Sequence, residues 1–182
     1  MGFSLTADAI FVPCYALRPG GELTAVNRRS VEIAIRLYHE GRAPVIILSH
    51  GYGLFWQREM ECKLALLAAG GIPETACVHI WPLPDEKMTN TFIEFERLAS
   101  VITSAHIRTM IVVVERWHSI RFRRWLTIAL PEITFFEEVF RERYERHLSE
   151  PRWKGFSTIP VIWPVWNVFF FLLTPFLVRQ VR

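Results

Sequence analysis

Short apolar runs alternate with longer amphipathic stretches along most of this chain. The runs are apolar at consecutive positions, which is typical of strands that are buried on both faces of a sheet. They are Ala9–Val12, Val45–Leu48, Val78–Trp81 and Met110–Val114, with Ile133–Phe136 as a fifth candidate. The pattern therefore predicts a set of short, fully buried strands.

Between these runs, apolar residues recur every three or four positions, which predicts helices with one buried face. The predicted helices cover about residues 25–40, 57–69, 91–103 and 120–130. Gly41 and the pair Gly70-Gly71 follow the first two helices, where glycine commonly ends a helix. Strands that alternate with helices in this way predict an α/β fold, a parallel sheet covered on both faces.

The 182 residues are enough for one such domain, which we assign to residues 1–150. Residues 151–155 are the expected linker, and residues 156–182 form an apolar C-terminal segment. Ile159–Val178 is apolar apart from Asn167 and Thr174, and twenty residues can span a bilayer as a helix. Pro164 and Pro175 would interrupt such a helix.

Two interpretations of this segment are open: a membrane anchor, or a helix packed on the domain. Basic residues between 141 and 154 precede the segment, and only Arg179 and Arg182 follow it. If the segment spans a membrane, this bias places the domain on the cytoplasmic side.

Charge and cysteine content narrow the function classes. The net charge is +3, and the basic residues between 121 and 154 are interleaved with glutamates, so nucleic acid is not an expected partner. Cys14, Cys62 and Cys77 form no CxxC pair, which fits a reducing compartment. No spacing predicts a metal site, and no glycine-rich nucleotide loop identifies a cofactor.

Polar residues follow each predicted strand, and parallel strands bring their carboxyl ends to one edge, where ligands bind. The turn Ser49-His50-Gly51 is either an ordinary turn or one whose backbone N–H groups hold a phosphate or carboxylate. Cys14 follows the first strand and is a weaker candidate, as a nucleophile.

Two further motifs lie at predicted helix starts. Thr89-Asn90-Thr91 with Glu94 is a capping-box arrangement, which leaves Asn90 as a candidate ligand contact. In a helix begun near His118, the side chains of His118 and Arg121 lie one turn apart, as a cation pair suited to an anion. His118 is also a candidate general acid or base, although a structural histidine is the alternative.

The pieces in this order resemble the YdcF/SanA/ElyC family of envelope-associated domains, over residues 7 to 138. The resemblance rests on Asp8-Ala-Ile-Phe-Val, Arg28-Arg29, Ile46-Ile-Leu-Ser49-x-Gly51, Thr89-Asn-Thr91-x-x-Glu94 and His118-x-x-Arg121. It implies a three-layer Rossmann-like domain, often membrane-tethered, with links to cell-envelope, peptidoglycan or lipid-carrier metabolism.

The polar residues typical of the family would correspond to Asp8, Arg28 or Arg29, Ser49, Gly51, Glu59 or Glu61, Asn90, Thr91, Glu94, His118 and Arg121. This chain departs from the family pattern at three places. Pro13-Cys14-Tyr15 replaces glycines after the first strand, His50 replaces a glycine, and Phe95 replaces an asparagine.

Our first hypothesis is a domain that binds an anionic, phosphate-containing small molecule or lipid-linked precursor, as a hydrolase or transferase if it is an enzyme. The anion would be held by Arg28, Arg29, Ser49, His50, Gly51, Asn90, Thr91 and Arg121, with His118 and Glu94 as the acid–base candidates. The second hypothesis is a non-catalytic, membrane-associated partner protein in envelope biogenesis. The third is a nucleotide or methyl-donor binding module.

Overall fold

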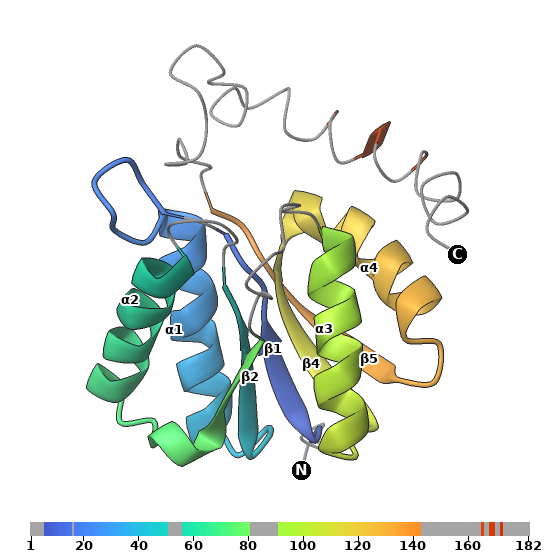
Figure 1. The fold of residues 1–182 in the computed structure, drawn as a ribbon, viewed down its shortest axis with the longest axis horizontal. Helices are drawn as coiled ribbons and strands as arrows, with labels where there is room; N and C mark the ends of the chain where they lie inside the picture. Colours follow the sequence, from blue (N-terminus) through green and yellow to red (C-terminus); the bar gives the residue numbers. More distant parts are fainter. Residues whose placement is uncertain are drawn as a thin grey trace.

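The computed structural model describes residues 6–15, 17–50, 56–80 and 91–142, together with Val165, Val168, Phe169 and Leu172 (Figure 1). In chain order the elements are β1 (Ala9–Val12), α1 (Ala25–His39), β2 (Val45–Ser49), α2 (Trp56–Ala69), the short 3-10 helix η1 (Glu74–Ala76), β3 (Cys77–Ile80), α3 (Thr91–Ser104), β4 (Thr109–Glu115), α4 (Arg116–Ala129) and β5 (Thr134–Phe140).

The strands form one parallel sheet in the order β3-β2-β1-β4-β5. Strand β1 is central, and its Phe11 aligns with Ile47 of β2 and with Val112 of β4. The chain runs from β1 outward through β2 to β3, then returns to the other side of β1 for β4 and β5. The direction of winding therefore reverses between β1 and β4, which is where such sheets bind ligands.

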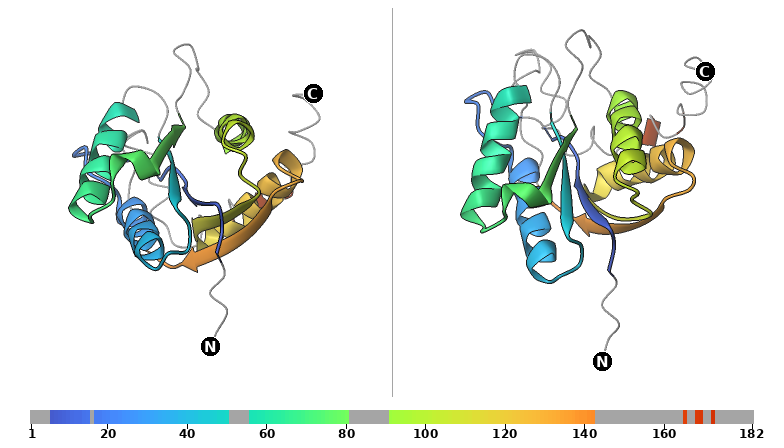
Figure 2. Two further views of the ribbon diagram at one scale, coloured as in Figure 1. Left: turned by 90° about the horizontal axis from the view of Figure 1, so that it is seen from below. Right: turned by 60° about the horizontal axis from the view of Figure 1, so that its bottom comes forward.

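Helices cover both faces of the sheet (Figure 2). Alternate strand residues supply the two cores: Ile10 packs beneath α1, whereas Phe11 packs beneath α3 and α4. Both side chains are fully buried, which explains why the strands are apolar at every position rather than at every second one. The predicted three-layer α/β fold is confirmed.

Local signals position the first helix well. The Thr24 side chain caps α1 by accepting the Asn27 N–H at 3.2 Å, and Gly41 follows the helix at a φ of 67°, a conformation that favours glycine. The predicted helix at 25–40 matches α1 to one residue. Together these signals place the start of α1 at the carboxyl edge of the sheet.

Two predicted boundaries are wrong. Helix α4 begins at Arg116 instead of about residue 120, because the Glu115 carboxylate accepts the N–H groups of Trp117 and His118 and so starts the helix directly at the end of β4. Strand β5 runs on to Phe140, past Glu137 and Glu138. Those two glutamates form ion pairs with Arg123 of α4 and Arg36 of α1, which allows charged residues inside a strand.

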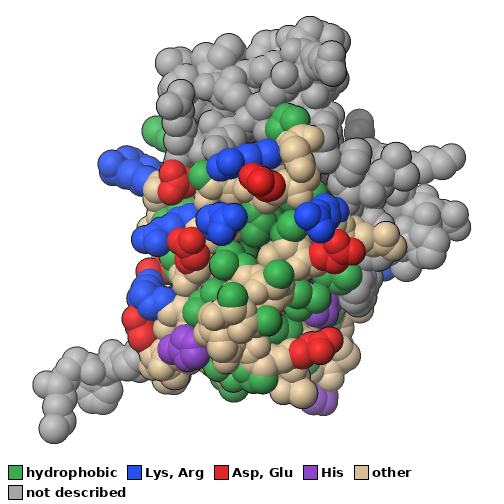
Figure 3. Space-filling model, turned by 90° about the vertical axis from the view of Figure 1, so that its left-hand side faces the viewer, with side chains coloured by type: hydrophobic (Ala, Val, Ile, Leu, Met, Phe, Trp, Pro, Cys, Tyr) green, Lys and Arg blue, Asp and Glu red, His purple; other side chains and the backbone are tan. Residues whose placement is uncertain are grey.

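The outer face on the α1 and α2 side carries basic and acidic side chains interleaved with one another (Figure 3). Pairs along single helices account for much of this pattern, including Arg29–Glu32, Arg36–Glu40 and Arg58–Glu61. Exposed pairs of this kind contribute little to stability, so the fold depends mainly on the two apolar cores.

The predicted linker 151–155 and nearly all of the C-terminal segment 156–182 lie outside the described residues. Within the part of the chain that the structure describes, no helix is both long enough and apolar enough to cross a membrane.

Candidate functional site

Buried polar side chains gather where β1, β2 and β4 end. Ser49 ends β2 and Glu115 ends β4, while Glu94 and His118 lie in the first turns of α3 and α4. All four are buried. Because buried polar groups are costly unless they are paired, their accumulation at the edge where parallel sheets commonly bind ligands marks it as the candidate site.

Glu94 is a buried acid of this edge, with 4% of its surface exposed. Its Oε1 atom accepts the backbone N–H of Cys14 at 3.1 Å, so the carboxyl group of α3 is directed at the end of β1. Burial raises the pKa of Glu94, and the Ser49 hydroxyl, the Cys14 N–H and the charges of Lys63 and Arg121 oppose that rise. The carboxyl group is thus suited to hold and release a proton closer to neutral pH than an exposed glutamate.

His118 and Arg121 are in direct contact, with 2.6 Å between His118 Nε2 and an Arg121 Nη atom. A guanidinium group can only donate hydrogen bonds, so Nε2 accepts, and the ring proton is on Nδ1. In this geometry His118 is neutral, and the pair carries one positive charge instead of the two that the sequence suggested. The His118 ring is held edge-on by Tyr15 and Phe122, at centroid distances of 5.3 and 4.5 Å.

Tyr15 fills the switch point between β1 and β4. Its hydroxyl oxygen accepts the Glu115 N–H at 2.8 Å, and only 3% of its surface is exposed. Burial raises the pKa of Tyr15 well above 10, so the phenol is neutral. The resemblance implied glycines in this loop; here an aromatic side chain joins the end of β1 to the start of α4.

A second buried group centres on an ion pair between Glu59 and Lys63 of α2, with 3.0 Å between Lys63 Nζ and Glu59 Oε1. The same carboxylate accepts the Asn27 side-chain amide at 2.7 Å and the Cys14 thiol at 3.3 Å. Lys63 also donates to the carbonyl oxygens of Pro13 and Ser49. We call Cys14, Asn27, Ser49, Glu59, Lys63 and Glu94 the carboxyl-edge cluster.

No family model, curated protein or solved structure matches this chain. The resemblance to the YdcF/SanA/ElyC family therefore stays a prediction, and the functional argument depends on the geometry of this edge. Among the described residues, no group of three or more histidine, cysteine, aspartate or glutamate side chains is placed to hold a metal ion.

Several sequence candidates do join this edge. Ser49, Glu94, His118 and Arg121 lie there, and Glu59 is the buried member of the alternative pair Glu59 or Glu61. Thr91 opens α3. Gly51 and Asn90 lie outside the described residues.

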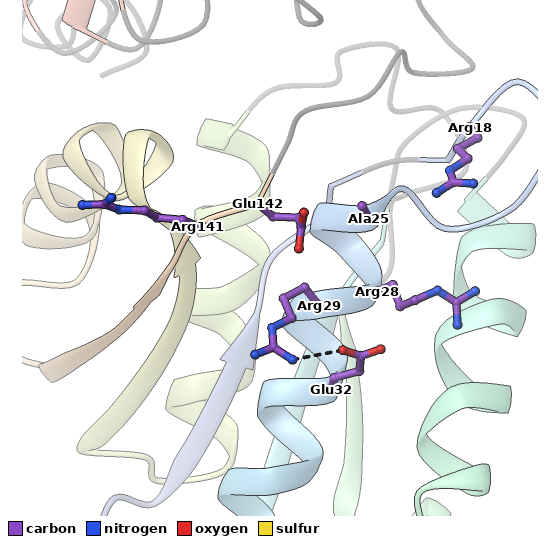
Figure 4. A pocket seen from close by; sticks show the side chains of 7 residues that line it. All are labelled: Arg18, Ala25, Arg28, Arg29, Glu32, Arg141 and Glu142. Atoms are coloured by element: carbon purple, nitrogen blue, oxygen red, sulfur yellow. Dashed lines mark hydrogen bonds and ion pairs between the residues drawn. The ribbon is translucent and has the colours of Figure 1, made fainter. Parts of the chain in front are cut away.

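Arg28 and Arg29 do not join it. Both are exposed on α1, across the sheet from α4, and they line an open pocket of about 490 Å³ with Arg18, Ala25, Glu32, Arg141 and Glu142. Figure 4 shows Arg28 and Arg29 leaving α1 in different directions, with Arg29 paired to Glu32 at 3.3 Å. The guanidinium groups around this pocket do not converge on one point, as they would in a site that binds a single anion.

Asp8 lies at the opposite edge of the sheet. Its Oδ2 atom accepts the backbone N–H groups of Arg108 and Thr109, each at 2.8 Å, and so ties the start of β1 to the start of β4. These hydrogen bonds lower the pKa of Asp8. The residue therefore supports the sheet and is remote from the candidate site.

His50 has a partner that the sequence did not suggest. Its Nε2 atom lies 3.0 Å from Nδ1 of His79 on β3, and the two rings stack with centroids 5.3 Å apart. Burial first, and the charge of Lys63 second, lower the pKa of His50 to about 2. The ring is therefore neutral at physiological pH and supplies no positive charge to an anion.

Sequence reasoning missed Lys63, Asn27 and Tyr15, and it gave Glu115 no role of its own. Lys63 had one usable signal, because Glu59, Lys63 and Leu67 are spaced by four residues and form the buried stripe of α2. A charged pair inside an otherwise apolar stripe indicates a buried contact. Asn27 and Tyr15 carry no such local signal, since their partners lie far away in the sequence.

Proposed function

We propose that this domain binds a phosphate-bearing anion, either a small molecule or the head of a lipid-linked precursor, between the ends of β1 and β4. The observation that carries the proposal is the contact of the neutral His118 ring with the Arg121 guanidinium beside the buried carboxyl group of Glu94. One cation, one neutral base and one acid of raised pKa form the minimal set for phosphate chemistry.

Arg121 is the proposed anion ligand. Its charge acts on both Glu94 and Tyr15, so the guanidinium lies close to the switch point. A planar guanidinium binds two phosphate oxygens at once, and the interaction is stronger away from bulk water.

His118 and Glu94 would divide the proton transfers of a hydrolase or transferase. When Arg121 turns to a phosphate oxygen, His118 Nε2 is released to accept a proton from an attacking water or hydroxyl group. As the new phosphorus–oxygen bond forms and the old one breaks, the leaving oxygen takes a proton from Glu94, which becomes ionised. The raised pKa of Glu94 supports its role as the acid.

One observation favours a second function, a non-catalytic partner protein in envelope biogenesis. Tyr15 occupies the switch point with a buried ring and a hydrogen bond to Glu115, where the resemblance implies open, glycine-containing turns. A filled switch point leaves less room for a substrate. Under this alternative the edge cluster stabilises a fold whose activity is binding, and the C-terminal segment is the proposed membrane contact.

Ligand binding and turnover separate the two proposals. Inorganic phosphate, pyrophosphate and farnesyl phosphate are titrated by calorimetry into the unmodified chain, into Arg121→Gln and into Arg108→Gln. Phosphate release is then followed for pyrophosphate, which is an anhydride, and for farnesyl phosphate, which is an ester. Arg108 is an exposed arginine at the opposite edge of the sheet, so Arg108→Gln removes the same charge as Arg121→Gln at a place remote from the candidate site.

We expect Arg121→Gln to bind about tenfold more weakly, equivalent to about 1.4 kcal/mol, and Arg108→Gln to bind normally. Equal weakening in both variants, or no binding by the unmodified chain, contradicts the anion site. Binding without phosphate release by the unmodified chain favours the non-catalytic alternative.

A further inference from the structure

Lys63 lies at the centre of the carboxyl-edge cluster with none of its side chain exposed. Its Nζ atom contacts Glu59 Oε1 at 3.0 Å, the Pro13 carbonyl oxygen at 3.3 Å and the Ser49 carbonyl oxygen at 2.5 Å. These contacts match the three N–H donors of an ammonium group. The amine therefore joins α2 to the ends of two neighbouring strands.

We propose that Lys63 is the positioning residue of the candidate site: it holds the ends of β1 and β2 so that the groups there face Glu94, and it places a positive charge near that acid. The role of Lys63 in ligand binding rests on the proposed function. The coupling of Lys63 to Glu94 does not, because it can be measured in the unliganded chain.

The connections from Lys63 to Glu94 are short. Pro13, whose carbonyl group Lys63 binds, directly precedes Cys14, whose N–H donates to Glu94 at 3.1 Å. Ser49 is bound through its carbonyl group, and its hydroxyl group acts on Glu94. One ammonium group thus fixes the two polar groups that approach Glu94 from the strand ends.

Stability alone does not explain a lysine at this place. Apolar residues of similar volume often replace a buried ion pair without loss, because each buried charge costs several kcal/mol of desolvation. A Glu59–Lys63 pair inside an apolar helix stripe is thus expected to stabilise the fold no more than two apolar residues of similar volume would. It is better suited to holding the ends of two strands together and to placing a positive charge near an acid.

The positive charge of Lys63 changes the pKa of Glu94 in a definite direction. Glu94 faces Cys14 from the end of β1, Ser49 of β2, Lys63 of α2 and Arg121 of α4, with the neutral Tyr15 nearby. Lys63 and Arg121 lower the pKa of Glu94 against the effect of burial. Removing the Lys63 charge should therefore keep Glu94 protonated to higher pH.

The test is a carbon-13 carboxyl NMR titration of Glu94 in the unliganded, full-length chain. In the double variant Glu59→Gln, Lys63→Met the buried pair is neutral, so no uncompensated charge is left behind. The variant also loses the contacts of Lys63 with the Pro13 and Ser49 carbonyl groups, which hold the Cys14 N–H and the Ser49 hydroxyl group at Glu94 and so favour its ionised form. The matched control is Arg58→Met, Glu61→Gln, which removes an exposed ion pair of 3.2 Å from the same helix. We expect the Glu94 midpoint to move to higher pH in the first variant only; an unmoved midpoint, or equal movement in the control, overturns the proposal.

A second measurement needs no change at Lys63 and decides the question if the double variant fails to fold. The nitrogen-15 shift of Lys63 Nζ is followed against pH in the unmodified chain and in Glu94→Gln. We expect an inflection at the pH where Glu94 titrates, and its loss in Glu94→Gln. A Lys63 Nζ shift that does not change at the pH where Glu94 titrates overturns the proposal. Failure of phosphate binding would contradict only the proposed function.

Discussion

The paired histidines at the ends of β2 and β3 predict a measurable dependence of stability on pH. His50 is 1% exposed, and its pKa falls from 6.5 to about 2 on folding. The folded chain therefore binds a proton at this ring much more weakly than the unfolded chain. Wherever the unfolded state binds more protons, the free energy of unfolding rises with pH. The contribution of His50 is complete above pH 6.5 and is lost progressively as the pH falls towards 2.

The size of this effect follows from the two pKa values. Each pH unit below 6.5 removes about 1.4 kcal/mol, so at pH 5 the contribution of His50 has fallen by about 2 kcal/mol. A glutamine at position 50 cannot titrate. In His50→Gln, the decrease in the free energy of unfolding between pH 7.5 and pH 5 should therefore be about 2 kcal/mol smaller than in the unmodified chain. The variant also loses the contact with His79, which lowers stability at both pH values and leaves the difference unaffected.

Urea unfolding at pH 5, 6 and 7.5 measures this difference, and equal slopes of free energy against urea show that both chains unfold to the same extent. The pKa of His79 is also lowered, first by burial, but that ring is present in both chains and its effect cancels. An identical pH dependence in both chains would refute the reasoning. Proton NMR of the His50 ring gives an independent check, since no titration is expected between pH 5 and 8.

Three further predictions concern single side chains. Because burial raises the pKa of Glu94, the unmodified chain should lose stability as the pH rises above 4.5 through the folded-state value, and Glu94→Gln should remove this loss in urea unfolding between pH 4 and 7. Tyr15→Phe should cost about 1–2 kcal/mol in thermal or urea unfolding, because the buried N–H of Glu115 loses its acceptor, and unchanged stability would contradict that hydrogen bond. Asp8→Asn should lower stability at pH 7 and progressively less below pH 3.8, since the lowered pKa of Asp8 reflects its hydrogen bonds to Arg108 and Thr109; a constant difference across that range would show that the charge is not involved.

Most of the fold could be predicted because the inner strands β1, β2 and β4 are buried on both faces. Runs such as Val45–Leu48 and Met110–Val114 are apolar at every position, and few structures other than a doubly covered parallel sheet accept them. The start of α4 could not be predicted in the same way. Glu115 and Arg116 suggest a polar loop in sequence, and only the closure of the Glu115 carboxylate on the next N–H groups turns them into a helix start.

The candidate site was predictable only in part, for a different physical reason. Position after a strand was enough to find Ser49 and His118, and the capping-box arrangement with Thr91 pointed to Glu94. Position along the chain could not assign the Glu59–Lys63 pair to this edge; that pair is buried, and Arg58–Glu61 on the same helix is exposed. Nor could it show that His50 would stack on His79, which is 29 residues away, and so remain neutral.

The carboxyl-edge cluster also has a consequence for how this chain folds. Its hydrogen bonds join partners far apart in the sequence: Asn27 and Glu59 are 32 residues apart, and Cys14 and Glu94 are 80 residues apart. Closing such long loops costs entropy, which the two apolar cores must offset before the cluster is complete. A fragment that ended before α3 would keep β1 and Lys63 but would lack Glu94. The candidate site is thus assembled by the two halves of the sheet together, and either half alone would carry only unfinished polar groups.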